Sequence, residues 1–454
     1  MGYRDTRAPL ETPAVAVASL HERRCSPISL TFRASRPDLS IVLLAIDEEQ
    51  NLATLLPEIS RVVRGIGVSS EVIVVDGGSR DDTVGVAARC GARVIRQGRP
   101  GYGEALRTGF AAAEGAYVVT MDADLSHEAG VIAHLWEARD PRGIAIASRY
   151  IPGGSARTGM VRLLLSRLLN AVFSRGLSLR VRDVSSGFRI YPLAALEKLS
   201  ARAADYDILP EILVRAHAEG WRITEIPFRY SPRRSGSSKA RLLHLGRAYL
   251  RTFARLWKLR NSIAAADYDE RAYDSPIPLQ RAWQRRRHEI VTRQAGTGQR
   301  IVDIGCGSSR ILRDLPGAIG IDLSFPKLRY MRRYGIPLVH GSIFALPLRD
   351  QSADVVVCSE VIEHVPAGPT PFAEMARVLR PGGILVLGTP DYARRSWRIF
   401  EALYRRLAPG GYADEHITHY THDELVAMVT GIGHRHLRTD YVLGSEMILT
   451  FERR

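Results

Sequence analysis

Aspartates that follow short apolar runs are the residues of the first half with the clearest capacity for chemistry. Asp76 comes directly after residues 71–75, and the pair Asp122 and Asp124 follows residues 116–121. An Asp-x-Asp pair supplies the hard oxygen ligands that Mg²⁺ or Mn²⁺ prefers, and a bound ion compensates the charge of a departing diphosphate. One such pair arises easily by chance. Its combination with the acidic turn DGGSRDDT that Asp76 opens predicts a metal-dependent site for a diphosphate compound.

The second half carries a glycine-rich turn directly after another apolar run. Residues 301–304 lead into Gly305 and Gly307. Glycines at such a turn let a ligand approach the backbone and the N-terminus of the following helix. A turn of this kind would suit a dinucleotide equally well. Asp322, at the end of the next apolar run, could bind both hydroxyls of a ribose.

These residues need parallel strands to position them. Short β-rich runs alternate with helical segments in both halves, which predicts an α/β fold with largely parallel sheets covered by helices. In open α/β sheets, ligands bind beyond the carboxyl ends of the strands, where these aspartates would lie. We expect strands at residues 40–46, 71–75, 116–121, 300–304, 318–321, 354–358 and 384–388, and a helix at 51–63.

The length of 454 residues predicts two domains, because a single domain typically holds about 100–200 residues. We expect a poorly ordered segment over residues 1–37, a first domain over 38–262 and a second over 263–454. The four cysteines are scattered without a CxxC pair. This favours reduced thiols and argues against a disulfide framework or a zinc site.

The net charge of +15 is concentrated in residues 220–300, where 18 Lys and Arg face 6 Asp and Glu. This concentration indicates a contact with lipid headgroups, phosphates or nucleic acid. Because no recognised nucleic-acid-binding motif accompanies the charge, we do not expect a nucleic-acid partner. The first 35 residues lack a basic start followed by a long apolar run, and no window of about 18 apolar residues occurs. We therefore expect neither a signal peptide nor a transmembrane segment.

Two segments, residues 240–260 and 160–175, predict amphipathic helices with basic residues. The first gathers its leucines and aromatic residues on one face. Such helices are typical of membrane surfaces, and the alternative is a surface helix whose apolar face packs on its own domain. We expect a cytoplasmic protein at the inner face of the cell membrane. The basic residues are Arg247, Arg251, Arg255 and Lys258 in the first helix and Arg162, Arg167 and Arg175 in the second.

Further motifs of the first half occur in order along the chain. They are DEEQNL at 47–52, DADLSH at 122–127, SRY at 148–150, DVSSGFR at 183–189 and RRSGSSK at 233–239. Together with the acidic turn, this series resembles glycosyltransferase family 2 with the GT-A fold over about residues 38–260. More closely it is similar to the dolichyl- or polyprenyl-phosphate sugar transferases. The resemblance implies a nucleotide-sugar donor, a Mg²⁺ or Mn²⁺ ion and a polyprenyl-phosphate or lipid-linked glycan acceptor.

The resemblance also implies roles for single residues. It makes Asp124 and Asp122 the metal ligands and catalytic residues. Ser126 stands where some relatives have a metal-contacting Gln. The implied donor-binding residues, at the nucleotide or its phosphates, are Glu48, Asp76, Asp122, Arg149, Arg233 and Lys239.

Three positions around the implied base pocket depart from the family pattern. Leu44 and Ile46 stand where the first motif usually has Pro and an aromatic residue, and Gly77 replaces a frequent second Asp. A UDP-linked and a GDP-linked donor therefore both stay open.

The acceptor decides the mechanism. A lipid monophosphate, with a second pKa of about 6, is largely ionised at neutral pH and can attack the anomeric carbon without a base. In-line attack would invert the configuration. A sugar hydroxyl would instead need a carboxylate base. Asp183 is the candidate for that catalytic role, and its alternative is a turn-capping aspartate.

The second half continues with LPL at 346–348, an acidic strand end at 353–364 and LRPGG at 379–383. With the glycine-rich turn, the series resembles the class I S-adenosylmethionine-dependent methyltransferases over about residues 268–454. It is similar to their small-molecule branch, which includes enzymes of ubiquinone biosynthesis. The resemblance implies a Rossmann-like fold and S-adenosylmethionine as the cofactor.

By this resemblance, Asp303, Gly305 and Gly307 shape the methionine pocket and Asp322 holds the ribose. Ser342 stands where an Asp often contacts the adenine, and Ser309 replaces the usual third glycine.

Methyl transfer from a sulfonium is intrinsically favourable, so such a domain mainly aligns the acceptor with the methyl group. Glu363, His364 and His416 could act as acceptor-side bases or serve the structure, and the sequence shows no metal-ligand cluster. One hypothesis is that both halves act on the same or a related glycan. The alternative is a glycosyltransferase of cell-surface glycan synthesis with a methyltransferase domain that only binds ligand or acts as a scaffold.

Overall fold

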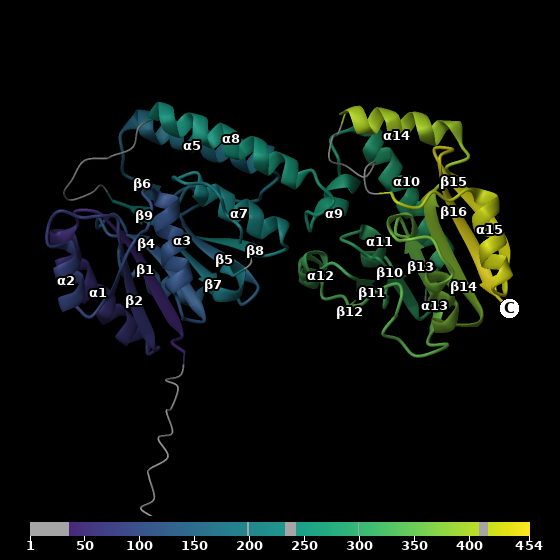
Figure 1. Ribbon diagram of the computed structural model, residues 1–454, viewed down its shortest axis with the longest axis horizontal. Coiled ribbons are helices and arrows are strands. Elements are labelled where there is room, and N and C mark those ends of the chain that lie inside the picture. The colour runs from purple at the N-terminus through teal and green to yellow at the C-terminus, as the bar shows by residue number, and fades with distance from the viewer. Residues whose placement is uncertain (1–35, 198, 232–241, 298, 408–415) are drawn as a thin grey trace, which may run out of the picture. The chain divides into compact units, whose positions relative to one another are not determined.

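The first half of the chain is built on a seven-stranded sheet (Figure 1). The computed structural model describes residues 36–197, 199–231, 242–297, 299–407 and 416–454. Residues 1–35 of the predicted N-terminal segment therefore lie outside the described residues. The strands of this sheet are β1 (Leu39–Ala45), β2 (Ser70–Asp76), β3 (Arg93–Arg96), β4 (Tyr117–Asp122), β5 (Gly143–Ser148), β7 (Arg189–Pro192) and β8 (Arg222–Pro227).

The strand order is β3-β2-β1-β4-β7-β5-β8. Neighbouring strands from β3 to β4 run parallel, as do β5 and β8, whereas β7 is antiparallel to both β4 and β5. The prediction of a largely parallel sheet is confirmed, with β7 as the exception. A separate two-stranded sheet joins β6 (Ser155–Ala156) to β9 (Arg229–Tyr230).

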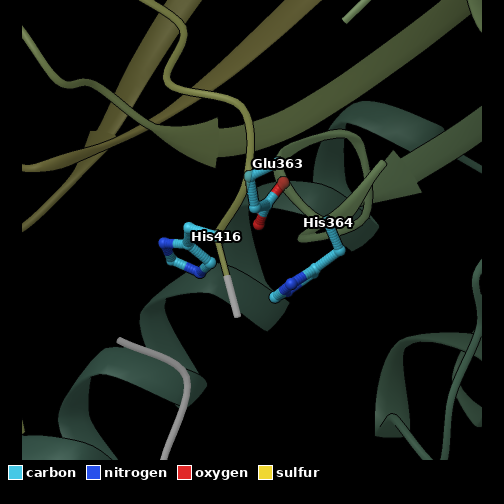
Figure 2. Close-up of side chains that lie close together, drawn as sticks. All are labelled: Glu363, His364 and His416. Carbon is cyan, nitrogen blue, oxygen red and sulfur yellow. The ribbon is translucent and has the colours of Figure 1, made fainter. Parts of the chain in front are cut away.

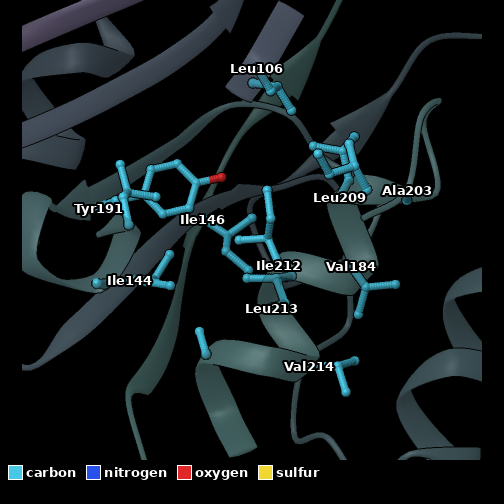
Figure 3. Close-up of a cluster of buried hydrophobic side chains, with 14 of the residues drawn as sticks. Leu106, Ile144, Ile146, Val184, Tyr191, Ala203, Leu209, Ile212, Leu213 and Val214 are labelled. Atoms are coloured by element: carbon cyan, nitrogen blue, oxygen red, sulfur yellow. The ribbon is translucent and has the colours of Figure 1, made fainter. Parts of the chain in front are cut away.

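Apolar side chains cover both faces of this sheet. Successive residues of a strand point to opposite faces, and accordingly Val42 lies in one core while Ile41 and Leu43 lie in the other. Figure 3 shows the first core, where Leu106 and Leu213 come from helices that pack on the sheet. The helices are α1 (Glu49–Ile66), α2 (Thr83–Arg89), α3 (Tyr102–Ala112), α4 (Val131–Glu137), α5 (Met160–Gly176), α6 (Leu193–Leu196), α7 (Ile208–Ala218) and α8 (Leu242–Arg260).

A second seven-stranded sheet organises the other half. Its strands are β10 (Ile301–Ile304), β11 (Ile319–Asp322), β12 (Leu338–His340), β13 (Ala353–Ser359), β14 (Leu379–Pro390), β15 (His434–Val442) and β16 (Glu446–Arg453). They are ordered β12-β11-β10-β13-β14-β16-β15. The sheet is parallel as far as β14, and β16 lies antiparallel between β14 and β15.

Helices accompany this sheet as well. They are α9 (Tyr268–Tyr273), α10 (Pro278–Ala295), α11 (Arg310–Arg313), α12 (Phe325–Met331), α13 (Thr370–Val378), α14 (Arg395–Leu407) and α15 (His422–Gly431), with 3₁₀ turns η1 (Arg332–Tyr334) and η2 (Ile362–His364). Among the described residues, no helix has both the length and the apolar character that crossing a bilayer requires. The predicted domain boundary at 262–263 falls between α8 and α9 and stays a prediction.

Candidate active sites

The aspartates of the first half lie at one edge of the sheet because three neighbouring strands end there. β1 lies between β2 and β4, and in their register Ala45 pairs with Asp76 while Leu44 pairs with Asp122. Asp124 follows at the end of β4, and Glu48 follows β1. The structure thus brings these predicted donor-binding and metal-binding residues to one edge of the sheet.

Backbone hydrogen bonds hold the turns that carry Asp76 and Glu48. The buried carboxylate of Asp76 accepts from the backbone N–H of Gly78 at 3.1 Å and of Ser79 at 3.0 Å. The backbone N–H of Glu48 donates to Thr83 Oγ1 at 2.8 Å, which ties the turn after β1 to the turn after β2. Hydrogen bonds therefore hold in place both turns that carry these carboxylates.

Asp122 and Asp124 differ in their exposure. The carboxylate of Asp124 is buried and accepts from the backbone N–H of Ser126 at 3.1 Å and from its hydroxyl. The Asp122 side chain is 32% exposed and accepts from the Tyr102 hydroxyl at 3.3 Å. Two carboxylates two positions apart, one buried and held by hydrogen bonds and one partly exposed, fit a hard divalent ion.

His127 supports this pair from behind. Its buried Nδ1 lies 3.0 Å from the backbone N–H of Asp122, which donates to it. Burial lowers the pKa of His127 although the nearby charges of Asp122 and Asp124 raise it. The neutral imidazole of His127 is thus the form that accepts this hydrogen bond.

Arg149 and Asp183 bind each other. Arg149 donates to the Asp183 carboxylate through Nε and Nη2, each at 2.8 Å, and through its backbone N–H at 3.0 Å. Asp183 is fully buried, which by itself raises its pKa, but the hydrogen bonds and charge of Arg149 outweigh burial and lower the pKa. A carboxylate held in this way is a weak proton acceptor and a good support for Arg149. The other two predicted phosphate-binding residues, Arg233 and Lys239, lie outside the described residues.

Helix α5 reaches this ion pair with its inner face. The Asn170 amide donates to Ser185 Oγ at 3.0 Å, and Arg149 Nη2 donates to the same hydroxyl at 2.8 Å. The hydroxyls of Tyr150 and Ser166 lie 2.7 Å apart. The position of α5 and the position of Arg149 are therefore linked by polar contacts.

The outer face of α5 is apolar and exposed. At 100° per residue its exposed apolar residues lie within about 140° of arc, and the exposed Arg162 and Arg167 flank them on the two sides. The exposed apolar residues, here called the α5 stripe, are Met160, Val161, Leu164, Leu165, Leu168 and Val172.

Helix α8 behaves differently. Tyr249, Phe253 and Leu256 pack on the core of the first half, where Phe173 of α5 meets the first two rings edge to face. Leu250 and Trp257 remain 72% and 43% exposed. For the described side chains of α8, the packing follows the alternative of a helix whose apolar face covers its own domain.

Two departures from the family pattern are neighbours in space. A Cβ at Gly77 would lie 2.2 Å from Cγ1 of Ile46, which is itself 42% exposed. The Ile46 side chain thus occupies the space that a side chain at position 77 would need. The two substitutions around the implied base pocket belong together sterically.

The glycine-rich turn of the second half has the conformation that its glycines allow. Gly305 and Gly307 have φ of 67° and 56°, and a Cβ at Gly305 would lie 2.3 Å from Cγ2 of Val361. The Asp322 carboxylate accepts from the backbone N–H of Gly307 at 2.8 Å and of Ser324 at 2.7 Å. These bonds hold Asp322 beside the turn, as a residue that binds ribose hydroxyls requires.

Asp303 and Ser342 complete the predicted cofactor residues. Asp303 is buried, and its burial, with the charge of Asp322, raises its pKa to about 8. The register pairs Asp322 with His340, so Ser342 comes just beyond the end of β12 at the same edge of the sheet. Its hydroxyl accepts from the backbone N–H of Phe344 at 3.2 Å.

One residue at this turn was not predicted from the sequence. Asp269 of α9 accepts from the backbone N–H of Ser308 at 3.0 Å and from its hydroxyl at 3.1 Å, and Lys327 Nζ lies 3.1 Å from the same oxygen. A Cβ at Gly307 would lie 2.6 Å from this carboxylate. The available signal was the acidic run at 267–274, which interrupts an otherwise basic stretch.

The structure also brings Glu363, His364 and His416 together (Figure 2). One ligand atom from each lies within 4.8 Å of the others. Burial raises the pKa of Glu363 to about 8, and burial with the neighbouring His364 lowers the pKa of His416 to about 4. The sequence alone predicted no metal-ligand cluster in this half, because His416 is distant along the chain.

Comparisons with known proteins find a match for each half of the chain. A family model described as glycosyl transferase family 2 matches residues 40–200, and one described as a methyltransferase domain matches residues 302–387. An uncharacterised glycosyltransferase of Mycobacterium tuberculosis is 34% identical over 203 residues, which are 44% of this chain and 88% of that protein. The first half is thus a GT-A transferase and the second a Rossmann-like methyltransferase domain. The chain belongs to glycosyl transferase family 2 and carries this methyltransferase domain in the same polypeptide.

Two named relatives match the first half. The dolichol-phosphate mannosyltransferase of Pyrococcus furiosus is 31% identical over 236 residues, 50% of this chain and 65% of that protein. The polyprenol monophosphomannose synthase of Mycolicibacterium smegmatis is 29% identical over 214 residues, 44% of this chain and 79% of that protein.

Solved structures match each half separately. The glucosyl-3-phosphoglycerate synthase of Mycobacterium tuberculosis, in complex with Mn²⁺, UDP and glucosyl-3-phosphoglycerate, is 26% identical with a TM-score of 0.40, over 50% of this chain and 80% of that chain. An S-adenosylmethionine-dependent methyltransferase of Thermotoga maritima is 20% identical with a TM-score of 0.32, over 37% of this chain and 87% of that chain.

Proposed function

We propose that the first half transfers a sugar from a UDP- or GDP-linked donor to a polyprenyl phosphate or related lipid-linked acceptor, with inversion at the anomeric carbon. The observation that carries this proposal is that Asp76 at the end of β2 and Asp122 and Asp124 at the end of β4 lie at one edge of the sheet, on the two strands that flank β1. The two relatives named for transfer to dolichol or polyprenol phosphate support a lipid-phosphate acceptor.

In this proposal Asp122 and Asp124 hold a Mg²⁺ or Mn²⁺ ion, whose charge supports the departure of the diphosphate. Glu48 and Asp76 contact the nucleotide. Arg149, held by Asp183, contacts a phosphate of the donor or the acceptor. Because an ionised phosphate is already a nucleophile, the reaction needs no carboxylate base, and Asp183 serves to position Arg149.

The α5 stripe supports attachment to a membrane surface on the cytoplasmic side. Its apolar side chains and flanking arginines match what an interfacial helix presents to lipid. The inner face of α5 contacts Ser185 beside Arg149, so the stripe belongs to the helix that borders the phosphate-binding residues. A lipid phosphate held in the membrane would then reach the site along this helix.

Flotation with anionic vesicles tests this attachment. The double variant Leu164→Asp with Leu168→Asp is expected to lose most vesicle binding, because it places two charges in the apolar stripe. Leu437→Asp, at a 44% exposed leucine of β15, is the matched control and should float like the unchanged protein. Equal flotation of all three proteins would contradict the membrane proposal, as would retention on DNA or RNA without vesicle binding.

We further propose that the second half transfers a methyl group from S-adenosylmethionine to a small-molecule or glycan acceptor. The positive φ angles of Gly305 and Gly307 and the placement of Asp322 support cofactor binding. Calorimetry with S-adenosylmethionine tests this step separately. Absence of binding would leave the alternative of a scaffold domain.

The decisive experiment for the whole chain is mass spectrometry of one reaction. The protein is incubated with Mn²⁺, a short polyprenyl phosphate, pooled UDP- and GDP-sugars and S-adenosylmethionine. We expect a lipid product heavier by one sugar that disappears in Asp124→Ala, and a further methyl group on that product would join the two halves in one pathway. An unchanged lipid in the presence of bound donor would refute the lipid-phosphate acceptor and favour a sugar hydroxyl.

A further inference from the structure

The cluster of Glu363, His364 and His416 is assembled by the backbone. Glu363 and His364 belong to η2, which follows strand β13. The backbone N–H groups of Ile417 and Thr418 donate to the backbone carbonyl of Glu363 at 2.9 and 3.1 Å. These bonds fix the segment that begins at His416 directly against η2, so the meeting of the three side chains is built into the fold.

Two atoms of the cluster are buried without a hydrogen-bond partner among the residues that the structure describes. The Glu363 side chain is fully buried; its Oε2 accepts from the Thr389 hydroxyl at 3.0 Å, and its Oε1 has no partner. Nε2 of His416 is likewise buried and unpartnered, while its Nδ1 lies 2.7 Å from the Tyr392 hydroxyl. Leaving a buried polar atom without a hydrogen bond is unfavourable, so two such atoms in one cluster point to a ligand that both can bind.

The surrounding charges favour a cation. Arg287 pairs with Glu360 at 2.9 Å and with Glu446 at 2.7 Å, so one guanidinium already serves two carboxylates. Glu363 forms no ion pair within the described part of the chain. A buried carboxylate normally needs a cation or a full set of hydrogen bonds, and Glu363 has neither.

The donor set identifies the class of ion. We propose that Glu363, His364 and His416 bind one divalent transition-metal ion of the Zn²⁺, Mn²⁺ or Fe²⁺ type. Two imidazole nitrogens and one carboxylate oxygen suit such ions better than Mg²⁺ or Ca²⁺, which prefer oxygen ligands alone. Figure 2 shows the Glu363 carboxylate directed between the two rings. The ligand atoms of one ion lie about 3–3.5 Å apart. Side-chain rotations that move these ligand atoms by about 1 Å would therefore complete the site.

Tyr392 acts as the outer support of this site. Its hydroxyl occupies Nδ1 of His416, which leaves Nε2 as the nitrogen that faces the other two ligands. Such an outer hydrogen bond fixes both the tautomer and the direction of a metal-binding histidine.

The site borders the glycine-rich turn, which indicates what the ion does. Val361, two residues before Glu363, has its side chain within 2.3 Å of where a Gly305 Cβ would lie. Three protein ligands leave coordination positions open, and an acceptor hydroxyl fits one of them. This role rests on the proposed methyltransferase function. The acceptor oxygen bonds to the methyl carbon, the carbon–sulfur bond breaks with its electron pair on sulfur, the hydroxyl proton passes to solvent, and the ion keeps its charge.

Titration calorimetry with Zn²⁺ alone tests the site. The full chain carries Asp124→Ala as a background, which removes the ion predicted in the first half. We expect one Zn²⁺ per chain in this background, and a loss of affinity of about 100-fold or more when Glu363→Gln or His416→Ala is added, since even outer-shell changes cost 10–100-fold. His419→Ala, at an exposed neighbouring histidine, is the matched control and should bind like the background.

S-adenosylmethionine binding by the same proteins separates the two proposals. Lost Zn²⁺ binding with retained S-adenosylmethionine binding in either variant supports the metal site. Absence of Zn²⁺ binding in the background, or equal binding in both variants, overturns it while the methyltransferase proposal stands. Zn²⁺ binding that depends on Glu363 and His416 in a chain that binds no S-adenosylmethionine would keep the site and refute the methyl-transfer role.

Discussion

Asp183→Asn is the change that most directly tests how the first half positions Arg149, the arginine proposed to contact a phosphate. The substitution keeps the shape of the side chain and removes the charge that Arg149 faces at 2.8 Å. Breaking a buried ion pair costs about 3–5 kcal/mol because the remaining charge is uncompensated. Arg149 is 16% exposed and the amide oxygen can still accept, so we expect the lower end, about 3 kcal/mol. For a domain of this size that corresponds to a fall in Tm of roughly 6–12 °C.

A double-mutant cycle isolates the pair. Arg149→Met alone leaves Asp183 as the buried unpaired charge and should cost a similar free energy of unfolding. The double variant removes both charges, so it should be more stable than the sum of the single changes predicts, with a coupling of about 2 kcal/mol. Differential scanning calorimetry measures the Tm values, and sugar transfer to polyprenyl phosphate measures activity. If Asp183 positions Arg149, the double variant is no less active than Arg149→Met.

The loss of stability at acidic pH adds an independent check on the same ion pair. The folded-state pKa of Asp183 is lowered, so the stability it contributes is present above its ordinary pKa and is lost as the pH falls below that value. Asp183→Asn should remove this loss. An unchanged Tm, no coupling in the cycle and a loss of sugar transfer beyond about 1000-fold would refute the positioning role and make Asp183 the base of a hydroxyl acceptor.

Three further predictions concern single residues. Asp124→Ala should lower sugar transfer by at least about 100-fold, measured with saturating Mn²⁺, because an electrostatic support of the leaving diphosphate is lost. Gly305→Ala should abolish S-adenosylmethionine binding in calorimetry, since its Cβ would lie 2.3 Å from Val361, whereas Gly296→Ala has an equally positive φ of 68° and open space and should still bind. The pKa of Asp303 is raised to about 8, so its contribution to stability is full below its ordinary pKa and is lost as the pH rises towards 8. Asp303→Asn should therefore flatten the decrease in β10 amide protection between pH 5 and pH 8, and an unchanged slope would show that Asp303 is already ionised.

The strands that carry the sites could be predicted because burial on both faces makes them continuous apolar runs. β1, β2 and β4 appear within one residue of the expected ends. Because the carboxyl ends of parallel strands share one edge of a sheet, the placement of Asp76 and Asp122 at the same edge was also foreseeable. The direction of β7 was not foreseeable, because a strand of four residues with few apolar side chains does not show whether it runs parallel or antiparallel to its neighbours.

Contacts between distant segments account for most of what the sequence did not reveal. An apolar helical face looks the same whether it meets a core or water, so the exposure of Leu164 in α5 and the burial of Leu256 in α8 could not be told apart. The backbone hydrogen bonds from Ile417 and Thr418 to Glu363 bring His416 to Glu363 across more than fifty residues of sequence. Asp269 is likewise distant from Ser308 in sequence, and its side-chain carboxylate accepts from the Ser308 backbone N–H.

The place of Asp269 decides where the second half can be cut from the first. A fragment that begins at residue 302, the start of the family match, would lack α9 altogether. Without α9, the backbone N–H of Ser308 loses its acceptor, and the hydroxyls of Tyr330 and Tyr334 lose Glu270, on which both converge at 2.7 Å. A fragment of the second half that keeps these contacts of the glycine-rich turn must therefore begin at or before Tyr268.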